Sequence, residues 1–285
     1  MILIDEPMSK HTTFGVGGAA DVFAVPSGTD DFVTCVLACR KLGVPYFVLG
    51  KGSDLLVADE GYRGVMISTE ELCGIEAEGT ELVCEAGASL KDVADKACDL
   101  GLTGFEFASG IPGSIGGACF MNAGAYDGCM ADVLRSVDVL AGDGTIVTIP
   151  VEELELGYRA SRVRTQGLVV LRARIGLTPG NKDAIQAKMD DLNQRRRDKQ
   201  PLEYGSAGST FKRPEGYFAG KLIMDSGLKG YTVGGACVSQ KHAGFVINMG
   251  GATAADVRAV ISHVQDEVER QFGVRLEPEV RFLGW

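Results

Sequence analysis

Two glycine-rich segments are the parts of the sequence whose composition could serve ligand binding. Residues 109–126 read SGIPGSIGGACFMNAGAY without a charged residue, and residues 50–55 read GKGSDL after a short apolar run. Glycine weakens helices and strands by about 0.5–1 kcal/mol relative to alanine, so packing alone favours other residues here. Bare backbone N–H groups can approach an anionic ligand closely. The segments therefore predict backbone cradles for a ligand, and tight turns between strands are the alternative.

Four further stretches hold polar residues that could act on such a ligand. Small residues flank Ser209 in GSAGSTFKRP and would expose its hydroxyl, and Arg159 in YRAS could clamp a carboxylate through two hydrogen bonds. Glu279 lies in LEPEVRF, and Lys199 ends the basic run RRRDK. Each has a competing interpretation. Ser209 could lie in a surface turn, Arg159 could form a surface ion pair, and Glu279 could simply face solvent. The basic run before Lys199 could be a helix C-terminus stabilised by its dipole.

The sequence lacks the motifs of a phosphate-binding P-loop and of a hydrolase serine nucleophile, and it has no clear dinucleotide-binding motif. The chain has no G-x-x-x-x-G-K-[ST] and no G-x-S-x-G, and the nearest approach to G-x-G-x-x-G, GVGGAA at 15–20, follows no clear strand. Three histidines and eight cysteines lack metal-ligand spacing, so no metal site is expected. His242 on its own is expected to be a polar histidine of the core or its rim.

The bulk composition bounds the class of protein. The 285 residues carry 28 basic and 38 acidic side chains, a net charge of −10, which argues against nucleic-acid and anionic-membrane partners. No signal peptide is recognisable, and no apolar run approaches the 18 residues of a membrane span. The cysteines contain no C-x-x-C pair and mostly lie in apolar runs. We therefore expect reduced thiols and a cytoplasmic protein.

The hydrophobic patterns predict an α+β fold. Helical spacing of apolar residues predicts helices at 30–42, 89–100, about 181–199 and 253–272. Strands are predicted at 46–49, 82–86 and 169–175, with a hairpin at 136–149 around GDG. Composition shifts divide the chain into predicted domains 1–65, 66–180 and 181–285, and the last residues could return to the first two.

Seven motifs together resemble one enzyme family. TTFGVGGAAD, LGKGSDLLV, GIPGSIGGACFMNAGAY, YRAS, GSAGSTFKRP, GGACVSQKHAGFVIN and LEPEVRF follow one another from Thr12 to Phe282. This succession resembles the UDP-N-acetylenolpyruvoylglucosamine reductase (MurB) family of peptidoglycan synthesis. The short path between Tyr158 and the next predicted strand resembles its shorter subtype, which lacks a tyrosine-bearing insertion.

The resemblance implies an FAD-binding region of the vanillyl-alcohol-oxidase type in two parts, followed by an α+β domain that binds the UDP-sugar. The glycine-rich segments would then surround the flavin and its pyrophosphate. Asp54 stands where many members have asparagine, so we expect it to face backbone amides or the ribose. The implied FAD-binding residues are Gly50, Lys51, Gly52, Ser53, Asp54, Leu55, Ser109, Gly110, Pro112, Gly113, Ser114, Ile115, Gly117, Asn122 and Gly124.

The resemblance also implies a reaction in which NADPH reduces FAD and the enolpyruvyl sugar then takes a hydride from flavin N5. Arg159 would bind the substrate carboxylate, and a protonated Glu279 would share its proton with the developing dianion. Ser209 would protonate the carbanion, with Lys212 as a candidate relay partner. The implied UDP-sugar contacts are Lys199, Lys212, Arg213, Lys229 and His242. The resemblance also implies that Arg213 replaces an asparagine common in the longer subtype and that His242 replaces a glutamine.

Two other functions remain as alternatives. A flavin oxidase of the same fold would act on a small alcohol or sugar and would not need Ser209. A non-catalytic sensor of flavin or UDP-sugar would not need Arg159, Ser209 or Glu279. For the reductase we expect NADPH and the UDP-sugar as small-molecule partners, and a monomer.

Overall fold

The computed structural model describes residues 1–285, and their contacts divide the chain into two compact units. The first unit comprises residues 1–2, 24–51 and 66–196, and the second comprises 3–23, 52–65 and 197–285. Parts of residues 1–65 therefore belong to both units. The division into three domains at 65 and 180 stays a prediction.

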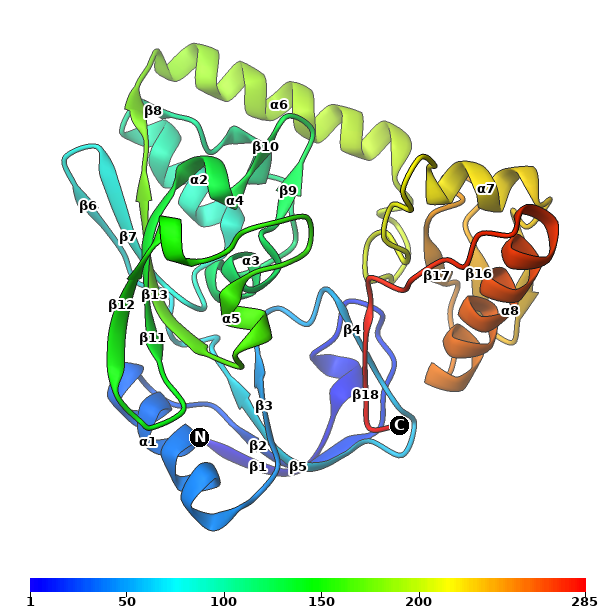
Figure 1. Ribbon diagram of the computed structural model, residues 1–285, viewed down its shortest axis with the longest axis horizontal. Coiled ribbons are helices and arrows are strands. Elements are labelled where there is room, and N and C mark those ends of the chain that lie inside the picture. Colours follow the sequence, from blue (N-terminus) through cyan, green and yellow to red (C-terminus); the bar gives the residue numbers. More distant parts are fainter. The chain divides into compact units, whose positions relative to one another are not determined.

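An antiparallel five-stranded sheet organises the first unit (Figure 1). The predicted hairpin is confirmed: β11 and β12 pair from Ser136 opposite Pro150 to Leu140 opposite Ile146. In the order of the sheet, its strands are β12 (Ile146–Pro150), β11 (Leu134–Leu140), β13 (Val169–Gly176), β7 (Glu81–Glu85) and β6 (Ile75–Glu78).

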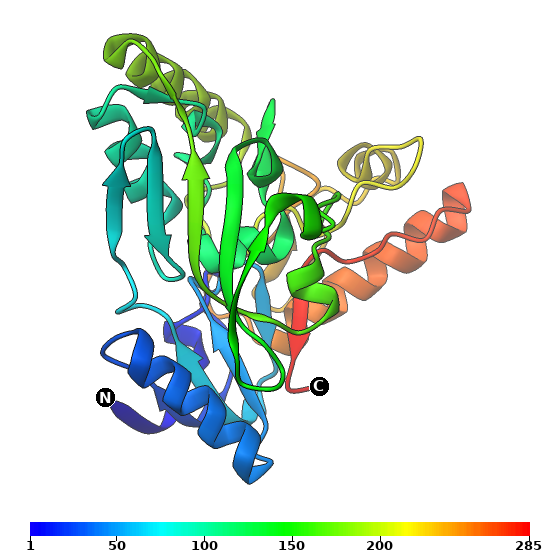
Figure 2. The same cartoon turned by 60° about the vertical axis from the view of Figure 1, so that its left-hand side comes forward.

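Helices α2 (Leu90–Asp99) and α3 (Ile115–Met121) share the hydrophobic core of this sheet (Figure 2). Every second residue of a strand points to the same face, which explains why alternate residues of the strands are buried. The buried pairs are Leu82 and Cys84, Val137 and Val139, and Ala173 and Ile175.

The predicted helices of the first unit are confirmed, with ends that differ by a residue or two. Ser89 caps α2, because its hydroxyl accepts a hydrogen bond from the Asp92 amide at 3.0 Å. Asn181 likewise accepts from the Ala184 amide at 3.0 Å where the long helix α6 (Lys182–Lys199) begins. The unit also contains α1 (Thr29–Leu42), β3 (Tyr46–Leu49), α4 (Met130–Val133) and α5 (Arg162–Thr165).

Short elements connect these parts. They are β8 (Leu102–Thr103), η2 (Glu106–Ala108), β9 (Gly124–Ala125), β10 (Gly128–Cys129), η3 (Val151–Glu153) and β14 (Thr178–Pro179).

The second unit is built around the helix α8 (Ala254–Phe272) and a small antiparallel sheet. The helix predicted at 253–272 is confirmed: Thr253 and Asp256 form a capping box at the start of α8, and Gly273 follows its end in the left-handed conformation. The Asp59 carboxylate accepts hydrogen bonds from the Ala254 and Ala255 amides at 2.8 and 2.9 Å. The sheet contains β15 (Thr232–Val233), β16 (Ala236–Val238) and β17 (Val246–Asn248).

The last strand of the chain returns to an early one. β18 (Arg281–Leu283) pairs in parallel with β4 (Leu55–Val57). The remaining elements are β1 (Ile2–Pro7), η1 (Met8–Lys10), β2 (Ala19–Ala24), β5 (Tyr62–Ser68) and α7 (Ala219–Asp225). None of the helices combines the length and the apolar character that a membrane crossing requires.

Candidate active site

The two glycine-rich segments meet in the first unit. Gly50 follows β3, and the buried Ser114 is the N-cap of α3. A Cβ atom on Gly50 would collide with the Ser114 hydroxyl, so a side chain at position 50 would push the segments apart. This contact explains by packing why residue 50 is a glycine. It also shows that the two predicted ligand-binding segments touch each other at Gly50 and Ser114.

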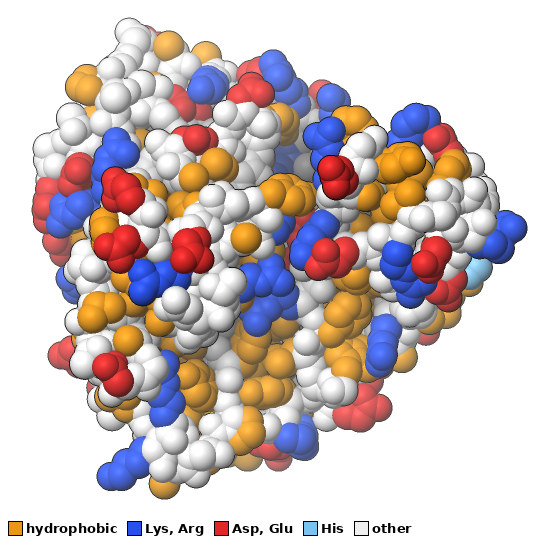
Figure 3. Space-filling model, in the orientation of Figure 1, with side chains coloured by type: hydrophobic (Ala, Val, Ile, Leu, Met, Phe, Trp, Pro, Cys, Tyr) orange, Lys and Arg blue, Asp and Glu red, His pale blue; other side chains and the backbone are white.

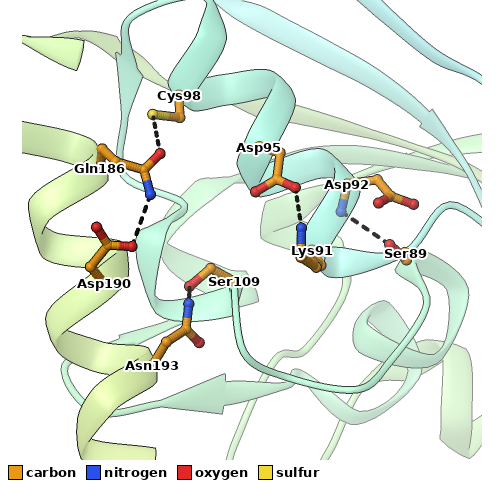
Figure 4. A network of polar contacts seen from close by, with 9 residues as sticks. All are labelled: Ser89, Lys91, Asp92, Asp95, Cys98, Ser109, Gln186, Asp190 and Asn193. Atoms are coloured by element: carbon orange, nitrogen blue, oxygen red, sulfur yellow. Dashed lines mark hydrogen bonds and ion pairs between the residues drawn. The ribbon is translucent and has the colours of Figure 1, made fainter. Parts of the chain in front are cut away.

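Helix α6 covers the start of the second segment (Figure 4). The side-chain amide of Asn193 donates a hydrogen bond to the Ser109 hydroxyl at 3.2 Å. A Cβ atom on Gly110 would collide with the Asn193 side chain and lie 3.3 Å from Cδ and Nη1 of Arg196. The predicted cofactor segment therefore lies directly against two polar side chains of α6.

Arg196 is a half-buried cation at this point. Its Nε and Nη1 atoms are buried without a hydrogen-bond partner, while the Tyr126 hydroxyl is a hydrogen-bond partner of the guanidinium. Burial lowers the pKa of Arg196, but an arginine remains charged near neutral pH. A buried donor without a partner costs about 1–3 kcal/mol. These nitrogens therefore suit an acceptor atom of a bound anionic group.

The segment 50–55 crosses from the first unit to the second between Lys51 and Gly52. A Cβ atom on Gly52, whose φ is +60°, would collide with the His11 carbonyl, so this glycine is required by the fold itself. The Asp54 carbonyl accepts a hydrogen bond from the Arg281 amide at 3.0 Å. Lys51 is exposed, Ser53 is half-buried, and Leu55 is buried at the start of β4.

The remaining predicted cofactor residues have partners within the first unit. The Gly113 carbonyl accepts from the Leu90 amide at 3.0 Å, and the Ile115 amide donates to the Ala88 carbonyl at 2.9 Å. Gly124 pairs with Cys129 between β9 and β10. These contacts account for the residue types through packing, and contact with FAD stays a prediction for these positions and for Pro112 and Gly117.

Arg159 lies in a loop that is fastened to the end of α3. The Asn122 side chain donates to the Gly157 carbonyl at 3.0 Å and accepts from the Ala131 amide at 2.9 Å. The Ser161 hydroxyl donates to the Phe120 carbonyl at 2.7 Å. Arg159 itself is half-buried with φ of +53°. Only α5 lies between this loop and β13, consistent with the predicted short path.

Ser209 and Glu279 are brought together in the second unit. The Glu279 amide donates to the Thr210 carbonyl at 2.8 Å, directly after Ser209. A β-bridge joins Phe211 to Pro278, and the Lys212 amide donates to the Glu277 carbonyl at 2.9 Å. Ser209 is exposed and Glu279 is half-buried. The segments carrying the predicted proton donor and the predicted acid are therefore paired by backbone hydrogen bonds.

Lys212, the candidate relay partner of Ser209, has an acidic partner in the structure. Its ammonium forms an ion pair with the Glu277 carboxylate. A relay role for Lys212 towards Ser209 would have to compete with this pair. Arg213, the next residue, stacks on the Phe218 ring with 4.0 Å between the guanidinium carbon and the ring centroid.

Other basic groups of the second unit lie around His242. The Lys241 ammonium donates to the Arg197 carbonyl at 2.6 Å, which ties this turn to the chain just before Lys199. Lys229 and Lys199 are exposed. On the face shown in Figure 3, basic side chains are interspersed with acidic ones. A negatively charged ligand is therefore expected to be selected by local groups rather than by the acidic chain as a whole.

His242 is a neutral donor in this setting. Burial and the nearby Lys229 charge lower the pKa of His242 from its ordinary 6.5. The Gly244 amide donates to Nδ1 at 3.1 Å, so the proton of the neutral ring is on Nε2. A neutral N–H donor is also what the family's glutamine offers, so this replacement keeps the chemistry of the position.

Sequence reasoning missed Arg196 and Asn193 as neighbours of the predicted cofactor segment, and it did not single out Tyr126 within that segment. One signal was present for Arg196: it follows Leu192 by four residues and so continues the buried face of Ile185, Met189 and Leu192. An arginine on the apolar face of a helix indicates a buried partner or ligand. Asn193 and Tyr126 carried no comparable signal.

Each unit thus assembles part of the predicted set. The first contains Gly50, the 109–124 segment and Arg159, and the second contains Ser209, Lys212, His242 and Glu279. The eight cysteines are free thiols, and no group of three or more His, Cys, Asp or Glu side chains is suited to a metal ion.

Comparisons with protein families match both parts of the chain. Residues 20–150 match the family described as FAD binding domain. Residues 200–283 match the family described as UDP-N-acetylenolpyruvoylglucosamine reductase, C-terminal domain. The predicted FAD-binding region is therefore confirmed.

Individual relatives are similar in sequence to this chain over nearly its whole length. The UDP-N-acetylenolpyruvoylglucosamine reductase of Clostridium perfringens (strain SM101 / Type A) is 56% identical over 283 residues, covering 99% of this chain and 93% of its own. The same-named protein of Caldanaerobacter subterraneus subsp. tengcongensis is 50% identical, with coverage of 99% and 94%. The crystal structure of UDP-N-acetylenolpyruvylglucosamine reductase from Thermus caldophilus superposes with a TM-score of 0.85 at 36% identity, with coverage of 99% and 98%.

Proposed function

The chain belongs to the UDP-N-acetylenolpyruvoylglucosamine reductase family, and we propose how its residues carry out the reaction of that family. It is an FAD-dependent oxidoreductase that reduces the enolpyruvyl group of UDP-N-acetylglucosamine enolpyruvate in peptidoglycan precursor synthesis. The residue roles, the use of NADPH over NADH, a cytoplasmic location and a monomeric state are proposals.

The residues of the first unit fit FAD. Gly50 and Ser114 bring two small-residue segments together, and Arg196 offers buried N–H groups without a partner beside Gly110. These are the donors that the phosphate oxygens or the electron-rich edge of a flavin nucleotide require. Bound FAD would supply the chemistry of hydride transfer from NADPH to the enolpyruvyl double bond. Arg196 and the 109–117 backbone would hold the cofactor.

The cofactor role of Arg196 can be tested apart from turnover. In Arg196→Met, removal of the charged donor should weaken FAD binding about 10-fold or more, because hydrogen bonds to charged groups contribute about 1.5–3 kcal/mol. Flavin fluorescence on titration into apoprotein gives the affinity. Arg195→Met is the matched control, since Arg195 is exposed and paired with Asp191 at 2.7 Å. Equal affinities in the two variants would rule out the contact.

Arg159 and Glu279 are assigned to the substrate carboxylate. A guanidinium binds a carboxylate through two parallel hydrogen bonds and opposes the negative charge that spreads into it as hydride arrives. Glu279 assists only when it carries a proton, which it shares with the developing dianion. Together they lower the cost of negative charge beside the reacting carbon.

Ser209 is assigned to the proton transfer. Its O–H bond breaks as a C–H bond forms at the carbon next to the carboxylate, and solvent later returns a proton to the serine oxygen. A hydroxyl is a weak acid, so the step requires close placement against a strongly basic carbon. The exposed position of Ser209 beside the paired Glu279 segment supports this assignment.

Lys199, Arg213, Lys229 and His242 are assigned to the UDP-sugar. Their positive or donor groups suit the diphosphate and the sugar oxygens. Arg213 adds a charge where asparagine is common in the family, so Arg213→Asn should weaken UDP-sugar binding and flatten its dependence on salt. Unchanged affinity and salt dependence would remove Arg213 from the binding set.

The observation that supports the proposal most is the hydrogen bond between the Glu279 amide and the Thr210 carbonyl, which joins the segment of the predicted acid to the segment of the predicted proton donor. The direct test is an anaerobic absorbance series. The purified protein should be yellow, NADPH should bleach it, and the enolpyruvyl sugar should restore the colour in one rapid turnover.

The same series separates the alternative functions. A flavin oxidase would regain its colour rapidly in air and not with the sugar. A sensor would bind flavin or sugar but would not pass electrons between them. Colourless protein that refuses added FAD would contradict the proposal.

A further inference from the structure

Arg159 occupies a backbone conformation that residues other than glycine rarely adopt. Its φ is +53°, in the left-handed region. Such a conformation persists only where the surroundings hold it, and it is common at functional sites. The loop around Arg159 must therefore contain contacts that stabilise this geometry.

The side chain of Arg164 makes such a contact. Its Nη1 donates a hydrogen bond to the Arg159 carbonyl at 3.0 Å. The same atom lies 3.8 Å from the Met121 sulfur, and the guanidinium carbon lies 5.9 Å from the centre of the Phe120 ring. Arg164 thus joins the peptide of Arg159 to the last residues of α3.

The position of Arg164 is itself fixed by the start of α5. The Ser161 hydroxyl accepts a hydrogen bond from the Arg164 amide at 3.1 Å and donates to the Phe120 carbonyl at 2.7 Å. The guanidinium and the helix that carries it therefore both contact the C-terminal end of α3. The N-terminal end of α3 begins at Ser114, against Gly50. One short helix thus connects the cofactor segments with the Arg159 loop.

We propose that Arg164 is a positioning residue for Arg159: it holds the Arg159 carbonyl against the end of α3 and so keeps the Arg159 guanidinium in the orientation that binds the substrate carboxylate. The inference rests on the proposed carboxylate-binding role of Arg159. Arg164 acts through the loop and touches neither the substrate nor the flavin in this account.

The test compares three variants of the FAD-loaded enzyme by stopped-flow absorbance. Arg164→Met keeps the length and apolar contact of the side chain but removes the donor, and Arg164→Lys keeps a charged donor. Arg162→Met is the matched control, because Arg162 lies on the same helix and pairs with Glu153 and Gln166 at 3.1 Å. Two rates are measured: bleaching by NADPH and recovery of colour with the enolpyruvyl sugar.

We expect Arg164→Met to slow recovery by the sugar about 10- to 100-fold, the loss that a misplaced binding group typically produces. Bleaching by NADPH should stay within about twofold of the wild type, and Arg164→Lys should recover much of the lost rate. Arg162→Met should match the wild type in both steps. A general structural defect would slow both steps alike, so equal slowing of bleaching and recovery would overturn the proposal.

A double-mutant cycle with Arg159→Ala completes the test. If Arg164 acts through Arg159, then adding Arg164→Met to Arg159→Ala should cause no further loss in the recovery rate. Losses that multiply in the double variant would overturn the positioning role. Should Arg164→Met fail to fold, the cycle is run with Arg164→Leu, which also removes the donor, with the same criterion.

The two proposals fail in distinguishable ways. Normal recovery in Arg159→Ala would overturn the carboxylate-binding role of Arg159 and the positioning role with it. Slow recovery in Arg159→Ala combined with normal recovery in Arg164→Met would leave the role of Arg159 in place and overturn that of Arg164.

Discussion

The loop of Arg159 and the loop of Ser209 are held in place by different kinds of hydrogen bond. Side chains hold the first: Asn122, Ser161 and Arg164 each bond to a backbone carbonyl of the loop or of α3. Backbone groups make the main contacts of the second, from the Thr210 amide to the Gly244 carbonyl at 2.9 Å and from the Glu279 amide to the Thr210 carbonyl at 2.8 Å. The hydroxyls of Thr13 and Thr210 add side-chain hydrogen bonds to it.

Because of this difference, substitutions in the two loops report on different things. A loop fixed by main-chain groups keeps its shape when a side chain is replaced, so substitution there reports on chemistry. A loop fixed by side chains moves when one of them is replaced, so substitution there reports on geometry as well. The predictions below test this distinction.

The largest effect is expected for Ser209→Ala. Recovery of flavin colour with the enolpyruvyl sugar should slow about 10²–10⁴-fold, because the proton donor is lost. Bleaching by NADPH and the melting temperature should stay near those of the wild type, since main-chain bonds hold the loop. Ser206→Ala, in the same loop, is the control for both measurements. Recovery at the normal rate would exclude Ser209 as the donor.

Asn122→Ala should produce the next largest effect, on stability. Asn122 has φ of +44° and makes two side-chain hydrogen bonds, so the change should lower the free energy of unfolding by about 2–4 kcal/mol. Asn122→Gly should cost about 1–2 kcal/mol less, because glycine accepts this conformation. Urea denaturation of the FAD-loaded protein measures both. Equal losses would show that strain at this position is unimportant.

Thr210→Val tests the backbone-held loop. The Thr210 hydroxyl accepts a hydrogen bond from the Val246 amide at 2.9 Å in a fully buried position. Its loss should reduce stability by about 1–3 kcal/mol while the recovery rate changes by less than about threefold. A large loss of rate at normal FAD content would show that this loop also depends on side chains.

His242→Gln should have the smallest effect. The lowered pKa of His242 means that the unfolded chain binds its proton more readily, so wild-type stability falls as the pH drops below about 6.5. Glutamine has no such titration. The stability difference between the proteins should therefore be constant above about pH 7 and shift against the wild type towards pH 5. Parallel profiles from urea denaturation would contradict this.

The sequence predicted secondary-structure elements well where a few neighbouring residues determine them. Thr253, Asp256 and Gly273 mark both ends of α8, and the GDG turn marks the β11–β12 hairpin. Ser209 was expected to be exposed, and it is. These features depend on neighbouring residues alone.

Features that depend on distant contacts could not be read in the same way. Nothing in YRAS indicates the left-handed conformation of Arg159 or the hydrogen bond that its carbonyl accepts from Arg164. The sequence patterns also did not indicate that segments 3–23 and 52–65 join residues from the end of the chain in one compact unit, because this depends on pairings such as β4 with β18.

The central claim is the proposal that Arg159, Ser209 and Glu279 all act on the enolpyruvyl group of the substrate. A crystal structure of the FAD-loaded protein with UDP-N-acetylglucosamine enolpyruvate tests it most directly. The account predicts the carboxylate on the Arg159 guanidinium and the Ser209 oxygen about 3–3.5 Å from the carbon that receives the proton. A carboxylate bound away from Arg159, or a Ser209 hydroxyl that cannot reach that carbon, would contradict it.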